Sequence, residues 1–101
     1  MINVIATIRV KAGRRSEFLK QAKSVVPSVT KERGCIQYFP TVDVDAGLPI
    51  QSLDENVVTM IEKWESLEAL RDHLKAPHMQ VYLQQIKEMV EGVSLKVLKE
   101  A

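Results

Sequence analysis

Hydrophobic and polar residues alternate along the first ten positions of the chain. One side of this pattern is entirely apolar and comprises Ile2, Val4, Ala6, Ile8 and Val10. The other side is mixed, because Ile5 stands between Asn3 and Thr7. A period of two with many β-branched residues predicts a β-strand over residues 2–11, with its apolar side toward a core.

After a turn at Ala12-Gly13 the spacing of apolar residues changes to three and four. Between residues 14 and 31 they are Phe18, Leu19, Ala22, Val25, Val26 and Val29. This spacing predicts an amphipathic helix. Pro27 lies within it and is expected to kink the helix or to end its first half, because proline cannot donate a backbone hydrogen bond. Gly34 is expected to close the segment.

A second strand is predicted over residues 35–44. One of its faces comprises Ile36, Tyr38, Pro40 and Val42. The proline favours an edge position or a bulge, because it lacks the N–H group that a central strand needs. Residues 45–56 contain Gly47, Pro49 and Ser52. They are predicted to form a loop that is long enough to have a function or to be mobile.

The third strand is predicted over residues 57–65. Its alternation places Met60, Glu62 and Trp64 on one face, which we assign to the helices. Ser66 is positioned to cap a short helix that follows directly. The apolar residues of that helix are Leu67, Leu70 and Leu74.

A further helix is predicted to begin near Pro77, because proline suits the first turn of a helix. Its apolar residues are Met79, Tyr82, Leu83, Ile86, Met89 and Val90. Gly92 is expected to end this helix, and residues 93–98 are expected to form the last strand.

The predicted order β-α-β-β-α-α-β is the ferredoxin-like split βαβ pattern with its second helix broken in two. We therefore expect an α+β fold with one four-stranded antiparallel sheet, in a single domain over residues 1–101. Ile5 and Ile61 fall on the sheet face that the helices leave bare. Two such apolar faces, stacked about a two-fold axis, would form a dimeric α+β barrel. We predict this homodimer, and a monomer is the open alternative.

Composition argues against several classes of partner and location. The formal net charge is +1 and basic residues are interleaved with acidic ones, so no nucleic-acid surface is expected. No apolar run approaches the roughly 20 residues of a membrane span, and the apolar start lacks the basic residues of a signal peptide. Cys35 is the only cysteine, which favours a reducing, cytoplasmic location.

Candidate reactive residues gather between Trp64 and Tyr82. Trp64, the only tryptophan, is either a core anchor or a flat wall for an aromatic ligand. His73 and His78 would lie about 140° apart on one helix, and Pro77 interrupts the helix between them. No cluster of cysteines or carboxylates accompanies them, so no metal site is predicted. The chain also lacks nucleophile-elbow, nucleotide-binding and phosphate-binding motifs.

Several passages resemble a known family. The passage from Ile61 to Leu74, followed by Pro77-His78-Met79, is similar to the signature of the antibiotic-biosynthesis monooxygenases. Other passages resemble the bacterial quinol monooxygenases of that family. They are Val4-Ile5-Ala6, Val26-Pro27, Lys31-Glu32-Arg33-Gly34-Cys35, Val42-Asp43, Ala46-Gly47 and Gln51-Ser52. The resemblance covers nearly the whole chain and implies the same dimeric α+β barrel.

The resemblance implies a monooxygenase that oxidises a reduced, naphthoquinol-like substrate with molecular oxygen and uses no cofactor, neither metal nor flavin. Such a substrate reacts best as a phenolate, so a base is needed, and His73 and His78 are the expected catalytic residues. A phenol of pKa about 10 and an imidazole of about 6.5 differ by roughly 5 kcal/mol, so hydrogen bonds or a cation must also stabilise the oxyanion. Arg9 and Lys63 are the cations considered. The expected substrate-binding residues are Trp64, Tyr38, Tyr82, Met60, Glu62 and Met79.

Two other functions stay open at this point. One is an isomerase or processing enzyme for a small oxygenated metabolite, since related members keep the spacing from His73 to Pro77-His78. The other is a non-catalytic dimer that binds a small ligand. Haem degradation is not expected, because the asparagine, tryptophan and histidine of the haem-degrading relatives are replaced here by Ala6 or Thr7, His73 and Leu83, respectively.

Overall fold

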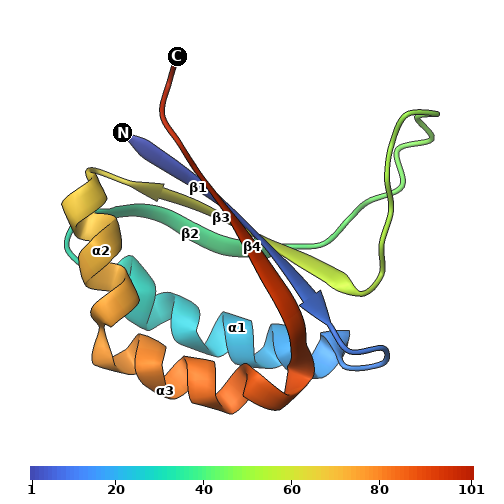
Figure 1. Ribbon diagram of the computed structural model, residues 1–101, viewed down its shortest axis with the longest axis horizontal. Helices are drawn as coiled ribbons and strands as arrows, with labels where there is room; N and C mark the ends of the chain where they lie inside the picture. Colours follow the sequence, from blue (N-terminus) through green and yellow to red (C-terminus); the bar gives the residue numbers. More distant parts are fainter.

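A computed structural model describes residues 1–101 as one four-stranded antiparallel sheet with three helices on one of its faces (Figure 1). The strands are β1 (Ile2–Val10), β2 (Cys35–Thr41), β3 (Val57–Trp64) and β4 (Val90–Leu98), in the spatial order β2-β3-β1-β4. The helices are α1 (Arg15–Thr30), α2 (Leu67–Lys75) and α3 (Pro77–Ile86). No helix has the length and apolar character that a membrane span requires. The predicted order of elements and the α+β, ferredoxin-like fold are confirmed.

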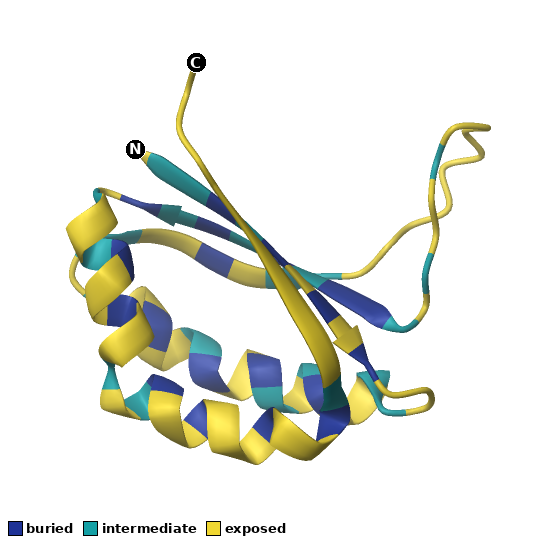
Figure 2. Cartoon of the chain, in the orientation of Figure 1, coloured by how far each residue is buried: buried dark blue, intermediate teal, exposed yellow.

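The core lies between the helices and the sheet face that they cover (Figure 2). The predicted inward side of β1 is buried from Val4 to Val10. Met60, Glu62 and Trp64 are likewise buried on β3, with exposed fractions of 6% or less. Burying a large apolar side chain stabilises the fold by about 1.5–3 kcal/mol. The alternation in the sequence therefore assigned the two central strands to the correct faces.

The first residues of β2 depart from the predicted pattern. Cys35 lies opposite Trp64, and the register then shifts before Gln37, so that Ile36 is an extra residue in the ladder. Cys35 therefore shares the helix side with Tyr38, and Ile36 is 41% exposed. The prediction that Ile36 lies on the face of Tyr38 is wrong. The predicted edge position is confirmed, because β2 is an outer strand.

Helix α1 continues past Pro27 to Thr30, so the proline does not end the helix. The buried residues of α1 are Phe18, Ala22, Val25 and Val29, which confirms the predicted apolar stripe. Val25 and Val29 lie on either side of the proline and both pack into the core. Their burial anchors the helix on both sides of the backbone hydrogen bond that proline removes.

The turn that follows α1 is locked against the start of α2. Gly34 has a φ of +84°, and a Cβ placed there would lie 2.6 Å from the Cβ of Ala69. The carbonyl of Gly34 accepts a hydrogen bond of 2.8 Å from the backbone N–H of Glu65. The side chain of Ser66 accepts one from the N–H of Ala69, which confirms the predicted helix cap. These contacts fix the distance between residues 31–34 and α2.

The last strand begins earlier than predicted. Helix α3 ends at Ile86, a 3₁₀ turn follows at Lys87–Met89, and β4 starts at Val90. Gly92 therefore lies inside the strand and does not end a helix. Val93 and Leu95 pair with the inward-facing Ile8 and Ala6, yet they are 60% and 53% exposed. Because no helix covers them, the inner side of β4 borders an opening.

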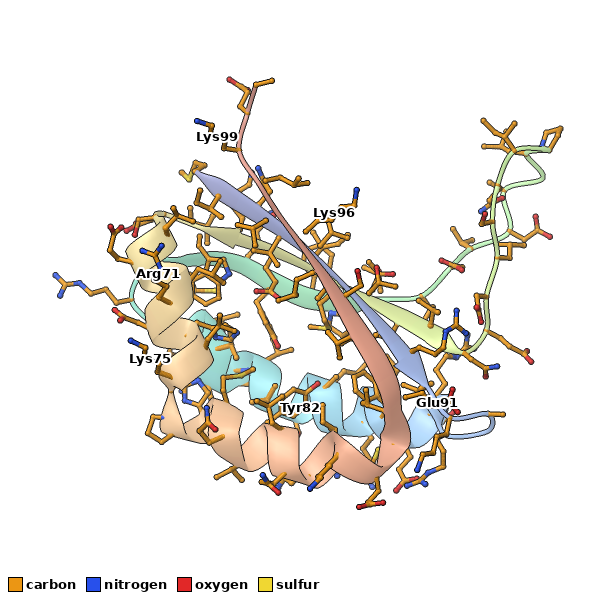
Figure 3. All side chains as sticks on the ribbon, in the orientation of Figure 1. Arg71, Lys75, Tyr82, Glu91, Lys96 and Lys99 are labelled. Atoms are coloured by element: carbon orange, nitrogen blue, oxygen red, sulfur yellow. The ribbon has the colours of Figure 1, made fainter.

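The sheet face opposite the helices is bare and partly apolar. Phe39, Ile61 and Ile5 lie side by side across β2, β3 and β1. Lys96 of β4 continues this row, and its side chain points away from the helices (Figure 3). The segment 42–56 extends away from the sheet beyond β2 and β3 (Figure 1). Its exposed apolar residues are Val42, Val44, Leu48, Ile50 and Leu53.

Candidate active site

A cavity of about 190 Å³ lies between the sheet and the α2–α3 pair. Eleven of its thirteen lining residues are hydrophobic, and the other two are Glu62 and His73. Leu74 and Leu83 from the helices and Leu95 from β4 are about half exposed, so they form its mouth. A larger hollow, of about 570 Å³, lies beside the chain ends, but four of its six lining residues are polar or charged. Only the smaller cavity combines an apolar wall with buried acid and base groups.

Local sequence features place the lining residues. The register of the sheet puts Tyr38 of β2 directly opposite Glu62 of β3. Ala76 is extended, with φ −61° and ψ 138°, and the following Pro77 begins α3 at its first turn. This break separates α2, which supplies His73, from α3. The two helices therefore line the cavity from different directions.

Glu62 is a carboxyl group in an apolar environment. It is 6% exposed, and its Oε1 accepts a hydrogen bond of 3.0 Å from the indole N–H of Trp64. Burial raises the pKa of the Glu62 carboxyl above its ordinary value, while the hydrogen bond from Trp64 opposes that rise. The group therefore keeps a proton to higher pH than an exposed glutamate does. Such a carboxyl is suited to proton transfer.

Two tyrosines, Tyr38 and Tyr82, line the same cavity. The hydroxyl of Tyr82 is buried and has no hydrogen-bond partner. Figure 3 shows Tyr82 on α3, on the side that faces the sheet. Burial, together with the negative charge of Glu62, raises the pKa of Tyr82 to about 12. Burial also raises the pKa of Tyr38. Both hydroxyls therefore remain protonated at neutral pH and are hydrogen-bond donors.

His73 is held on three sides. It is 2% exposed and its ring lies 4.6 Å from that of Trp64, centroid to centroid, at 37°. Tyr38 meets it edge-on at 5.4 Å. The Nδ1 atom lies 2.9 Å from Oε2 of Glu32, and this is the only hydrogen bond that the His73 ring makes in the protein. One ring nitrogen is thus anchored and the other is left available beside the cavity.

Glu32 also binds the second histidine. Nε2 of His78 lies 2.7 Å from the same Oε2 atom of Glu32, which is mostly buried. On one continuous helix the two histidines would point in different directions. The break at Ala76 places them on two helices, and both reach the same carboxylate. No group of three His, Cys, Asp or Glu side chains is arranged to hold a metal ion.

The structure brings together most of the predicted site residues. Those that line the cavity are Tyr38, Met60, Glu62, His73, Met79 and Tyr82. Trp64 does not line it, because the indole is fully buried behind His73. His78 does not line it either and is instead 31% exposed, beyond Glu32.

Neither of the cations considered from the sequence, Arg9 and Lys63, lines the cavity. Arg9 pairs with Asp54 at 2.8 Å, and both side chains are exposed. Lys63 lies opposite Asn3 on the bare face of the sheet. Alternation directs both side chains away from the helices, so neither of the two cations considered for the oxyanion lies in the cavity wall.

Sequence reasoning missed Glu32. It lies in the turn after α1, 41 residues from His73 and 46 from His78, so no local pattern links the three. The only signal was its place in the passage Lys31 to Cys35, one of those that carry the family resemblance. That signal indicates a site but gives no partner.

The comparisons with known proteins agree with this architecture. The family model described as antibiotic biosynthesis monooxygenase matches residues 1–85. The Escherichia coli (strain K12) protein named "Probable quinol monooxygenase YgiN" is 41% identical over 98% of this chain and 97% of its own length. The Bacillus subtilis (strain 168) protein YcnE is 33% identical over 91% of this chain and 88% of its own.

Solved structures show the same fold. A conserved protein from Methanosarcina mazei Go1 superposes with a TM-score of 0.84 at 23% identity, covering 99% of this chain and 92% of that one. The match of the family model over most of the chain and the identity to YgiN are both strong. This chain therefore belongs to the antibiotic biosynthesis monooxygenase family.

Proposed function

We propose that residues 1–101 act as one domain that oxidises a neutral, naphthoquinol-like substrate with molecular oxygen. The observation that carries the proposal is the apolar cavity with Glu62, His73 and two tyrosines on its wall. The name of the YgiN relative, which is 41% identical, supports a quinol as substrate. A flat, apolar ring with two hydroxyl groups suits such a wall, because its ring is buried and its hydroxyls find polar partners.

The chemistry assigned to the substrate is a two-step use of oxygen. The quinol hydroxyl loses its proton, and the electron-rich ring then transfers electrons to molecular oxygen. One oxygen atom enters the ring to give a hydroxyquinone, and the other leaves as water. The substrate supplies the electrons, so the residues need only bind the ring, take up the proton and stabilise the oxyanion.

His73 is the residue to which we assign proton uptake. Glu32 engages its Nδ1 atom, which leaves Nε2 for the substrate, and His73 carries the only imidazole on the cavity wall. The hydroxyl of Tyr82 is the donor assigned to the substrate oxygen, because it is buried without a hydrogen bond. A donor that is already desolvated and aimed at the oxyanion stabilises it more than water does.

The cavity wall favours uncharged ligands. No lysine or arginine lines it, and burial raises the pKa of its one carboxyl group, Glu62. A ligand with a sulfonate or carboxylate would meet no compensating charge there. We therefore expect reduced menadione to bind and its sulfonated analogue to bind poorly.

We further propose that the protein is a homodimer through the bare face of its sheet. Phe39, Ile61 and Ile5 form an apolar row on that face. Stacking of two such faces removes this row from water. The arrangement leaves the cavity, on the opposite side of the sheet, accessible to substrate.

An isomerase that acts on a small oxygenated metabolite is the second candidate. Glu62 and His73 line the same cavity and are a carboxyl group and an imidazole, which suits transfer of a proton from one carbon to another. Such an enzyme would consume no oxygen. It would instead exchange substrate protons with deuterium from the solvent.

Oxygen uptake tests the proposed function. We expect chelator-treated, flavin-free protein to consume oxygen with reduced menadione faster than the protein-free blank. His73→Ala is expected to lower the rate above the blank by about 100-fold or more, as for loss of a general base. Val81→Ala, an exposed change on α3, is the matched control and should retain the wild-type rate.

Two results would contradict the proposal. A wild-type rate equal to the blank would remove this quinol as substrate and favour the isomerase or the binding protein. Uptake that is unchanged in His73→Ala would keep the reaction but remove His73 as the base. Mass spectrometry with ¹⁸O₂ should find one labelled atom in the hydroxyquinone product.

A further inference from the structure

The carboxylate of Glu32 is the centre of a partly buried hydrogen-bond cluster that the proposed function does not use. Its Oε2 atom lies 2.9 Å from Nδ1 of His73 and 2.7 Å from Nε2 of His78. His73 lines the cavity, whereas Glu32 and His78 do not. The carboxylate therefore contacts the proposed base from behind.

The chemistry of a carboxylate determines where the protons lie. An ionised carboxylate only accepts hydrogen bonds, so the ring nitrogens that face it must carry hydrogen. In its neutral form, His73 is then protonated on Nδ1 and has its lone pair on Nε2. This is the form in which the nitrogen left without a protein partner can accept a proton.

The backbone holds Glu32 firmly in place. Its N–H donates to the carbonyl of Val29 at 2.9 Å, and its own carbonyl accepts from the N–H of Cys35 at 3.2 Å. Gly34, two residues after Glu32, packs directly against Ala69 of α2. His78 donates from the opposite helix to the same carboxylate oxygen. The carboxylate is thus fixed from its backbone and from its side-chain partner.

We propose that Glu32 is a positioning residue for His73, and this inference rests on the proposed function. It holds the imidazole in the Nδ1–H form and stabilises the cation that forms when the substrate is deprotonated. In that step the substrate O–H bond breaks, a new N–H bond forms at Nε2, and the electron pair stays on the substrate oxygen. The carboxylate keeps its hydrogen bond to Nδ1–H throughout, as a buried aspartate does for the histidine of a serine protease.

The tautomer of His73 provides a test that needs no substrate. The chain has only two histidines, so ¹⁵N-histidine labelling gives two rings to assign. At a pH at which both rings are neutral, we expect the wild type to show the Nδ1–H form of His73. Glu32→Ala should shift this ring toward the Nε2–H form. Retention of the Nδ1–H form in Glu32→Ala would overturn the inference.

Kinetics separate position from charge. Glu32→Ala should lower kcat with reduced menadione by about 100-fold, with KM nearly unchanged because Glu32 does not line the cavity. Glu32→Gln keeps an oxygen that accepts from Nδ1–H, so it should keep the tautomer but lose about tenfold in kcat for lack of charge. Added formate should restore part of the activity of Glu32→Ala. Glu91→Ala, an exposed change at the start of β4, is the matched control (Figure 3).

The possible failures can be told apart. If Glu32→Ala does not fold, the kcat of Glu32→Gln tests the role of the Glu32 charge. A wild-type kcat in Glu32→Gln would then overturn the inference. If the wild type consumes no oxygen with reduced menadione, the proposed function fails, but the tautomer measurement still decides the role of Glu32. An active wild type with equally active Glu32 variants keeps the function and removes Glu32 from it.

Discussion

At the residue scale, the buried hydroxyl of Tyr82 is a polar group without a hydrogen-bond partner. Folding removes the hydroxyl from water without giving it a hydrogen bond within the protein, which costs about 1–3 kcal/mol of stability. A ligand oxygen in the cavity would supply the missing partner. The energy lost on folding is therefore available as binding specificity for a molecule with a suitable oxygen.

Tyr82→Phe should raise stability while it weakens binding. We expect the free energy of unfolding to increase by about 1 kcal/mol, because the unpaired hydroxyl is removed and the ring remains. We also expect menadione to bind roughly five- to tenfold more weakly, for loss of one hydrogen bond. Urea denaturation measures the first effect, and quenching of the single tryptophan, Trp64, measures the second. Lower stability with unchanged affinity would show that the hydroxyl has a partner within the protein.

At the element scale, the site depends on how closely the turn after α1 approaches α2. That turn carries Glu32 and α2 carries His73, and the two meet only because Gly34 has no side chain. A β-carbon at this position would overlap Ala69. The glycine is therefore required for both its backbone conformation and its contact.

Gly34→Ala should be far more disruptive than Gly13→Ala. Both glycines have positive φ, so each alanine incurs about 1–2 kcal/mol of backbone strain. Nothing lies within 4 Å of the added carbon at Gly13, whereas at Gly34 it meets Ala69 at 2.6 Å. We expect a total loss of about 3 kcal/mol or more for Gly34→Ala. Thermal denaturation of the two variants side by side measures the difference, and equal losses would mean that α2 moves freely.

At the scale of the whole molecule, the two faces of the sheet differ in what covers them. The helices and the cavity occupy one face, and the row of Phe39, Ile61 and Ile5 occupies the other. A second copy of the chain can therefore cover the apolar row without blocking the cavity. The homodimer remains a prediction of this arrangement.

Ile61→Lys should separate the proposed dimer into monomers, because it would place two charges in a buried apolar contact. Val81→Lys, on the exposed side of α3, should leave the dimer intact. Light scattering after size-exclusion chromatography measures the mass, and the single chain has 11.4 kDa. A wild-type protein of single-chain mass would contradict the dimer directly.

The sequence by itself determined the secondary structure and most of its faces. Alternation on β1 and β3, the cap at Ser66 and the start of α3 at Pro77 are local signals, because each depends on neighbours within a few residues. The family resemblance extended them to the fold. Tyr38, Glu62 and Tyr82 could be assigned to the site for the same reason, since each lies on the inner side of a predictable element.

Only the tertiary structure decided which reactive groups meet. The bulge at Ile36 changed which residues of β2 face the helices. The contact of Glu32 with His73 joins residues that are 41 positions apart. Arg9 and Lys63, by contrast, do not line the cavity. Periodicity gives the direction of a side chain from its own element. It does not give the position of that element relative to another, which follows from packing contacts such as that of Gly34 with Ala69.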